Sequence, residues 1–472
     1  MTTEYRIAGI ETPAWPNMFR RDPEECPRIE TAHRRITTKL PAPQTLDLVK
    51  SYSDLIPNVN CSPPPVLWDR AEGYQVFDAA GNCWIDFSST AVMTNTGHGH
   101  PAIRDAIAHH IEDGLLAQFS FASEIRMALA KRLLELAPPG FAKVYFWTTG
   151  SETIECAFRV AREWAMQQHR EKYHILTHAG NYHGWTLGAH QLSGKSAAKP
   201  WLTRPDAAIH HIPFPAERSA DTRTSNSDWQ AFFEESIAGL ESSGVPSDDV
   251  AAIFIETLQA WGALPLPVSY VQALRHWADE HNVLVIFDEI QTGFGRTGKW
   301  FGHEHYGVKA DLLCIGKGLT SSLPLAAVLG PADVLDVLPP GEITTTHAAH
   351  PLSCAAALAN LKVLEGENLI EEAARKGKVA RAELLKLKKR FPRPIAEING
   401  KGLLQAVHVR NPQSGQPNPK LAHDWTWSAV KHGVMLFFTT HPTIKICPPL
   451  VISDDALVEG IGALGDALES VL

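Results

Sequence analysis

The sequence predicts an α/β fold, in which a large domain has a mostly parallel sheet flanked by helices and a smaller α+β domain lies beside it. Between Pro101 and Pro351, apolar runs of strand length alternate with segments of helical period. This alternation is typical of parallel strands joined by crossover helices. A chain of 472 residues is also too long for one small domain, and an apolar content of 44% is ordinary for a globular protein.

The N-terminal part of the chain lacks this alternation. Residues 1–65 are rich in proline and only weakly periodic, so we expect an arm that lies on the rest of the protein. Residues 67–87 contain the turn residues Gly73, Asp78 and Gly81, and they predict a short antiparallel meander.

The alternating region supplies the predicted sheet and its helices. We expect helices over residues 102–111, 123–136, 151–164 and 269–279, and strands over residues 144–147, 174–177, 251–255, 283–287, 312–315 and 326–329. After Pro351 come two long helices, the second ending near Arg390, then short strands and a closing helix over residues 455–472. We therefore predict an N-terminal arm with part of the small domain (1–90), a large domain (91–350) and a C-terminal small domain (351–472).

Charge and composition exclude several classes of partner. With 43 basic and 52 acidic residues the formal charge is −9, which argues against nucleic-acid binding. The N-terminus lacks the apolar segment of a signal peptide, and no apolar run approaches the ~20 residues that cross a bilayer. The seven cysteines show neither a disulfide framework nor a zinc spacing, and we expect Cys314 and Cys354 to be buried. A cytoplasmic protein fits these features best.

Two ionisable residues stand at the ends of neighbouring predicted strands. Asp288 ends one apolar run, and Lys317, between Gly316 and Gly318, follows the next. Ligands bind at this edge of open α/β sheets. Such a pair suits pyridoxal phosphate (PLP), whose aldehyde a lysine captures as a Schiff base and whose ring nitrogen needs an acidic partner. Each residue alone is also common in ordinary turns, so the prediction depends on their combination.

Residues 293–298 read G-x-G-x-x-G after a strand, as in dinucleotide-binding sites. Such a site needs a helix that begins on the glycines and an acidic residue at the end of the next strand. Here the aromatic, glycine-containing residues 299–302 follow, and Asp311 precedes its strand. We therefore reject a nicotinamide site.

Other segments supply possible parts of a PLP site. Gly150 and Ser151 begin a helix after a strand, where free N–H groups bind phosphate, although Ser151 would also serve as an ordinary N-cap. Tyr182 follows a strand and would either stack on a pyridine ring or fill the core. Glu256 ends a strand, where a carboxylate would orient substrate or have no function.

Histidines also cluster in the sequence. The pairs at 98/100, 210/211 and 303/305 resemble metal ligands. None has companion ligands at a recognised spacing, so we predict no metal site.

An ordered series of motifs marks a similarity to a known family. The motifs are Gly97-His98-Gly99-His100-Pro101, Thr149-Gly150-Ser151-Glu152, Tyr182-His183-Gly184, Asp288-Glu289-Ile290-Gln291, Gly316-Lys317-Gly318, Thr346-His347 and Pro448-Pro449-Leu450. From about Leu67 to Ser453 the chain resembles the class III (subgroup II) PLP-dependent aminotransferases, a group that includes omega-amine transaminases and dialkylglycine decarboxylase.

The resemblance implies the fold type I architecture of PLP-dependent transferases and a homodimer, or a tetramer, with a shared active site. It makes Lys317 the Schiff-base lysine and the proton carrier at the substrate Cα. It pairs Asp288 with the ring nitrogen and places Gln291 near the ring hydroxyl.

The remaining cofactor contacts also follow from the resemblance. Gly150 and Ser151 would hold the phosphate, and Tyr182 would stack on the ring. Thr346 would reach the phosphate bound to the neighbouring subunit, and Glu256 would border the substrate pocket.

The chain departs from the family where substrate is bound. Lys445 stands where many members have an Arg that grips a substrate carboxylate, and Lys cannot form the bidentate pair of Arg. Trp261 stands where a small or acidic residue is common, and Phe437 and Phe438 occupy the region of a mobile Arg. We therefore hypothesise an apolar or aromatic pocket, to which Trp68 contributes, and a donor that is an amine or is weakly anchored by its carboxylate.

The sequence thus predicts a PLP-dependent aminotransferase that moves an amino group from an amine or amino acid to a keto acid in a ping-pong cycle. The alternative is another PLP reaction on the same fold: dialkylglycine-type decarboxylation, racemisation or phospho-lyase chemistry. Residues 88–92 lack the Gln that dialkylglycine decarboxylases use. Intact Lys317 and Asp288 argue against a non-catalytic binding protein.

Overall fold

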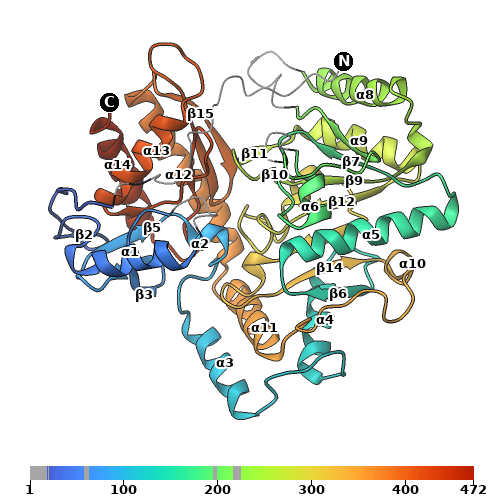
Figure 1. The fold of residues 1–472 in the computed structure, drawn as a ribbon, viewed down its shortest axis with the longest axis horizontal. Helices are drawn as coiled ribbons and strands as arrows, with labels where there is room; N and C mark the ends of the chain where they lie inside the picture. The colour runs from blue at the N-terminus through green and yellow to red at the C-terminus, as the bar shows by residue number, and fades with distance from the viewer. Residues whose placement is uncertain (1–18, 20, 58–62, 195–198, 216–224) are drawn as a thin grey trace.

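The structure, a computed structural model, describes residues 19, 21–57, 63–194, 199–215 and 225–472 (Figure 1). Its largest sheet has seven strands in the order β6-β14-β13-β12-β9-β7-β8. These strands are β6 (Lys143–Trp147), β7 (His174–His178), β8 (Ile209–Ile212), β9 (Val250–Glu256), β12 (Leu284–Asp288), β13 (Leu312–Ile315) and β14 (Ala326–Gly330). Strand β14 runs opposite to the other six strands, so the predicted mostly parallel sheet is confirmed.

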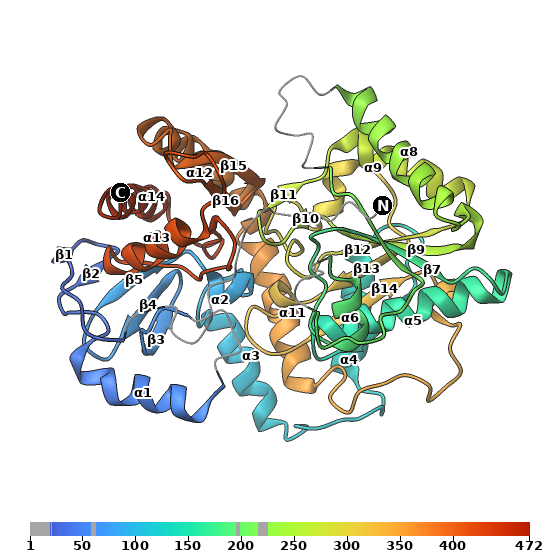
Figure 2. The same ribbon diagram turned by 45° about the horizontal axis from the view of Figure 1, so that its top comes forward.

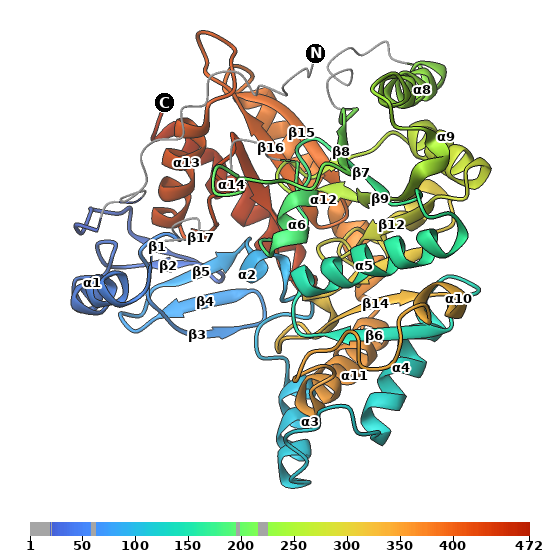
Figure 3. The ribbon, with the colours of Figure 1, turned by 45° about the vertical axis from the view of Figure 1, so that its right-hand side comes forward.

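Helices cover this sheet on both faces. They are α4 (Glu124–Leu136), α5 (Gly150–Gln168), α6 (Leu187–Leu192), α8 (Asn226–Ser242), α9 (Val268–Glu280) and α10 (Ala332–Leu335). Two more helices, α3 (Pro101–Glu112) and α11 (Pro351–Gly366), pack against each other, and α11 also packs against α4. Figure 3 shows α5 running across the strands, where it contacts β6, β9, β12, β13 and β14. Strand side chains alternate between faces, so Ile286 and Cys314 pack with α5 whereas Phe287 and Ile315 pack in the other core.

The rest of the chain forms smaller sheets. The N-terminal sheet contains β1 (Ile29–Glu30), β2 (Arg35–Ile36), β3 (Trp68–Glu72), β4 (Gln75–Asp78) and β5 (Cys83–Asp86), and β17 (Val434–Met435) pairs with β5. The C-terminal part contains β15 (Ile395–Lys401), β16 (Leu404–Val409) and β18 (Thr443–Ile446) in one sheet, with α12 (Leu369–Arg390), α13 (Pro419–Lys431) and α14 (Asp454–Glu469). A two-stranded sheet joins β10 (Leu258–Gln259) to β11 (Leu264–Pro265).

These elements confirm the predicted antiparallel meander, since β3, β4 and β5 pair in that manner. Strand β17 carries a C-terminal segment to this sheet, and Figure 2 shows the sheet beside α13 and α14. The exact division into three domains stays a prediction. Parts of the predicted arm, residues 1–18, 20 and 58–62, lie outside the described residues.

The proline-rich arm contains a helix that the sequence did not predict, α1 (Leu46–Leu55). Leu48, Tyr52 and Leu55 do recur at helical spacing, but they are exposed and sit in proline-rich surroundings that obscured the signal. Cys314 and Cys354 are buried as predicted. Within the described parts of the chain, no helix combines the length and apolar character needed to cross a membrane.

The glycine-rich loop at residues 293–298 joins distant segments. A 3-10 helix (Gly302–Tyr306) follows it where a dinucleotide site would need an α-helix, which supports rejection of that site. The fully buried Arg296 donates hydrogen bonds to the carbonyls of Leu403 (3.0 Å) and Pro448 (2.5 Å) and to Oδ1 of Asn95 (2.8 Å). The loop therefore stabilises the region where N-terminal and C-terminal segments meet the large sheet.

Candidate active site

Three predicted site residues lie at one edge of the seven-stranded sheet. Asp288 ends β12, and its Cα neighbours are Glu256 at the end of β9 and Cys314 on β13. Lys317 begins a short 3-10 helix (Lys317–Leu319) directly after β13. Because these strands are parallel, their carboxyl ends meet at the edge where open α/β sheets bind ligands.

Asp288 is buried and oriented by two hydrogen bonds. Nδ1 of His183 lies 2.9 Å from its Oδ2, and the N–H of Ile290 donates to its Oδ1 at 3.1 Å. A carboxylate can only accept here, so His183 carries its proton on Nδ1. The sequence places His183 within a motif but does not indicate a role for it. The structure shows that it positions the carboxylate predicted to meet the ring nitrogen.

Lys317 has the properties of a nucleophilic amine. Its φ of +39° is strained for a residue with a side chain, and a Cβ on the next residue, Gly318, would lie within 3 Å of the Asn95 amide. Burial lowers its pKa to about 8, and the charge of Lys445 contributes to the shift. Among the described residues none forms a hydrogen bond with its amine, which leaves the nitrogen available for a ligand.

Glu256 holds two loops together rather than facing an open pocket. Its Oε1 accepts from the N–H of Tyr182 at 2.8 Å, and its Oε2 accepts from the N–H of Ala260 at 2.9 Å. Burial, and secondarily the charge of Asp288, raises the pKa of Glu256 well above its usual value. The carboxyl thereby orients the segments that carry Tyr182 and Trp261.

The first turn of α5 offers backbone N–H groups that no helix carbonyl accepts. Thr149 caps the helix in a capping box with Glu152, and the N–H groups of Gly150 and Ser151 fall in the first turn, which lacks intrahelical acceptors. A Cβ on Gly184, whose φ is +136°, would meet Ser151 Oγ at 2.2 Å. The backbone N–H donors at this turn suit a phosphate group.

Aromatic rings line the loops beside Glu256. The ring of Tyr182 meets Trp261 edge-on at 5.2 Å and Trp185 edge-on at 5.7 Å. Trp261 also stacks on His441 at 4.7 Å. We call Tyr182, Trp185, Trp261 and His441 the aromatic wall. It joins two of the predicted residues, Tyr182 and Trp261, in direct contact.

Lys445 is more enclosed than a flexible substrate anchor would be. It lies on β18, is 3% exposed, and donates to the carbonyl of Ala260 (2.9 Å) and to Oε1 of Gln291 (3.1 Å). The structure therefore brings two predicted residues, Gln291 and Lys445, into contact through a hydrogen bond that sequence reasoning did not foresee.

Two predicted residues lie apart from this group. Thr346 is exposed on the loop before α11. Trp68, at the start of β3, meets the ring of His98 edge-on at 5.9 Å. Their assignments to a neighbouring phosphate and to the substrate pocket stay predictions.

Histidines outside the site pair with carboxylates. Nε2 of His98 lies 2.8 Å from Asp86, and Nε2 of His100 lies 3.0 Å from Glu367. Across the described ranges, no three His, Cys, Asp or Glu side chains gather as metal ligands would. These pairs connect separate segments of the fold, so they have a structural role.

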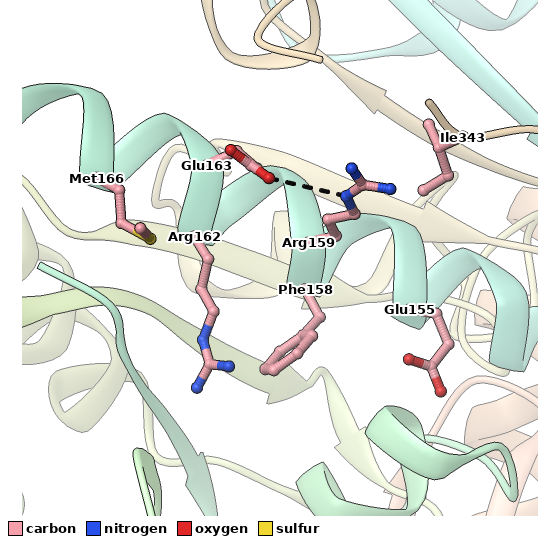
Figure 4. Close-up of a pocket in the computed structure, with 7 residues that line it drawn as sticks. All are labelled: Glu155, Phe158, Arg159, Arg162, Glu163, Met166 and Ile343. Atoms are coloured by element: carbon pink, nitrogen blue, oxygen red, sulfur yellow. Dashed lines mark ion pairs between the residues drawn. The ribbon is translucent and has the colours of Figure 1, made fainter. Parts of the chain in front are cut away.

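A cavity lies along α5, away from the strand ends (Figure 4). Its volume is about 480 Å³, and Arg159, Arg162 and Met166 are among its lining residues. An ion pair joins Arg159 and Glu163, one turn apart on α5. None of its lining residues belongs to the predicted site, and the strand ends are the better candidate because the chemically suited groups converge there.

Comparisons with known proteins find relatives that match most of the chain. The family profile described as Aminotransferase class-III matches residues 56–468. An ornithine aminotransferase of Saccharomyces cerevisiae is 31% identical, with 91% of this chain and 98% of the relative covered. An alanine/serine racemase of Pyrococcus horikoshii is 30% identical, with 93% of each covered. The crystal structure of an (S)-enantioselective omega-transaminase from Thermomicrobium roseum matches with a TM-score of 0.83 and 29% identity, covering 90% of this chain and 98% of that one.

Proposed function

Since the chain belongs to the class-III aminotransferases, which are PLP-dependent enzymes of fold type I, we propose which residues hold its cofactor and which amines it uses. The enzyme moves an amino group from a donor to a keto acid by a ping-pong mechanism. Both half-reactions use one site, so the same residues must bind donor and acceptor in turn.

The cofactor site is assigned to the group at the strand ends. Lys317 would bind the aldehyde end of PLP, and Asp288, oriented by His183, would hold the proton on the ring nitrogen. When bound, PLP supplies an electron sink for the bonds at the substrate Cα. The Gly150–Ser151 turn would bind the phosphate through backbone N–H groups.

Further contacts are assigned around the ring. Tyr182 would stack on its face, Gln291 would donate to its hydroxyl, and Thr346 would reach the phosphate of a second subunit. Lys317 would also carry the proton at the substrate Cα, because its pKa of about 8 lets the amine accept and return a proton near neutral pH.

The donor proposed for this site is a hydrophobic or aromatic amine, with a keto acid as acceptor. The contact of Trp261 with Tyr182 carries this proposal, since it puts an indole beside the residue expected to cover the cofactor ring. Two of the three possible hydrogen bonds of Lys445 are already made to protein acceptors, so a carboxylate would find no free bidentate partner there.

The test is to follow the visible absorption of the PLP-loaded enzyme while it reacts with a panel of donors. Arylalkyl amines should bleach the band at least tenfold faster than α-amino acids with polar side chains, and Lys317→Ala should show no change. Polar α-amino acids outranking hydrophobic amines would contradict the proposed donor class.

Racemisation is the second candidate, because a racemase is among the relatives. Incubating the loaded enzyme with one enantiomer of an amino acid, without keto acid, separates the two reactions. An aminotransferase stops after one amino group per site, whereas a racemase converts the whole pool to the mirror-image form.

We propose a homodimer in a cytoplasmic setting. Phe119 and Phe121 are 46% and 75% exposed on the segment after α3, and Arg126 joins this segment to the Thr346 loop through the carbonyls of Phe119 and Ala348. A second copy that covered these rings would also approach Thr346. Light scattering of Phe121→Asp should give a monomer; a dimer that persists would place the interface elsewhere.

A further inference from the structure

The contact between Lys445 and Gln291 restricts how Gln291 meets a ligand. Lys445 carries only hydrogen-bond donors, so the oxygen of the Gln291 amide, rather than its nitrogen, must face it. The carbonyl of Ala260 and the ring of Phe437, 5.7 Å from Nζ, enclose the lysine on other sides. The Gln291 amide is thereby held in one of its two flip states.

This flip state decides what Gln291 offers on its other side. The N–H groups lie across the amide carbon from the oxygen, and in the described chain none of them has an acceptor. Gln291 follows Asp288 by three residues on the loop after β12. The phenolic oxygen of PLP is a strong acceptor, and a freely flipping amide would present it with a carbonyl as readily as with a donor.

We propose that Lys445 is a positioning residue, which holds the Gln291 amide as a hydrogen-bond donor to the phenolic oxygen of the cofactor. It is not the anchor of a substrate carboxylate. This inference rests on the cofactor contacts proposed above. Three features support it: the burial of Lys445, the direction of both its hydrogen bonds toward protein acceptors, and its place inside β18, where its backbone pairs with Ala406.

The positive charge of Lys445 and the hydrogen bond from the Gln291 amide both favour the deprotonated form of the loaded site. A cation near Lys317 lowers the pKa of that amine, and a donor to the phenolic oxygen favours its anionic form. Removing Lys445 should therefore favour the protonated state of the loaded site, even when no substrate is present.

The test is a pH titration of the visible absorption of the PLP-loaded enzyme without substrate, together with the dissociation constant of PLP. In Lys445→Met we expect the titration midpoint to rise by about one pH unit and PLP to bind roughly fivefold more weakly. Lys445→Arg, which keeps a cation and donors, should stay within about 0.3 unit of the wild type and restore PLP binding.

A matched control is Lys172→Met. Lys172 is also buried, at 4% exposure, and also donates to two carbonyls, those of Asp248 (3.1 Å) and His281 (2.7 Å), but it lies outside the proposed site. We expect this variant to leave the midpoint and PLP affinity unchanged. If it shifts them as Lys445→Met does, general loss of a buried lysine explains the effect and the inference fails.

A second variant, Gln291→Leu, tests the route through Gln291, and by itself it can be measured even if Lys445→Met folds poorly. Gln291→Leu should raise the titration midpoint by itself. Lys445→Met should then shift the midpoint of the Gln291→Leu protein by less than half as much as it shifts the midpoint of the otherwise wild-type protein. Full additivity would overturn the inference. So would an unshifted midpoint in Lys445→Met combined with a tenfold higher KM for keto acids, which is the result for a substrate anchor. A wild-type protein that stays colourless with PLP would overturn the cofactor assignment as well, which distinguishes the two failures.

Discussion

The pH dependence of cofactor capture by Lys317 is a quantitative test of the proposed site. Burial lowers the pKa of this amine from 10.5 to about 8. At pH 7 an amine with a pKa of 8 is about 9% neutral, whereas one with a pKa of 10.5 is about 0.03% neutral, a difference of roughly 300-fold. Because only the neutral amine attacks an aldehyde, capture should rise from about pH 6 and level off above about pH 8.5.

The assay mixes apo-protein with excess PLP in a stopped-flow spectrometer over about pH 5.5 to 10, with butylamine as a reference for the titration of PLP itself. Lys317→Ala should capture none. The carboxylate of Asp288 raises the pKa of Lys317, so Asp288→Asn should move the inflection to lower pH. A rate that keeps rising tenfold per pH unit up to pH 10 would refute the argument, because it would show an ordinary, solvated lysine.

Three further changes have defined outcomes. Arg296→Met leaves buried acceptors unpaired and should lower the free energy of unfolding by about 3–5 kcal/mol in urea titrations. The control Arg159→Met, at the surface, should lower the free energy of unfolding by under ~1 kcal/mol. Trp261→Ala removes the indole of the aromatic wall and should lower kcat/KM for arylalkyl amines about tenfold, with short aliphatic amines affected less than threefold. Gly150→Val adds carbons at a position where even a single Cβ would lie 3.0 Å from Ile290, so PLP affinity by equilibrium dialysis should fall at least tenfold while the circular dichroism spectrum is unchanged.

The large sheet could be predicted because its buried strands are continuous apolar runs between glycine-rich turns. Residues 283–287 and 312–315 fall within or next to the observed strands for this reason. Strand β8 was missed, since its two central residues are His210 and His211, which read as polar although His210 lies against His174 in the sheet. Helix α8 was missed as well, although its apolar residues recur at helical spacing.

Local sequence was sufficient to single out Asp288 and Lys317 as candidates, because a strand end and its flanking glycines are encoded by adjacent residues. The partners of these groups depended on the tertiary structure. His183 lies 105 residues from Asp288, and Lys445 lies 154 residues from Gln291. Such hydrogen bonds form only after strands and loops from distant segments come into register, and no local pattern of residue types specifies that register. The reinterpretation of Lys445 as a partner of Gln291 therefore came from the folded protein.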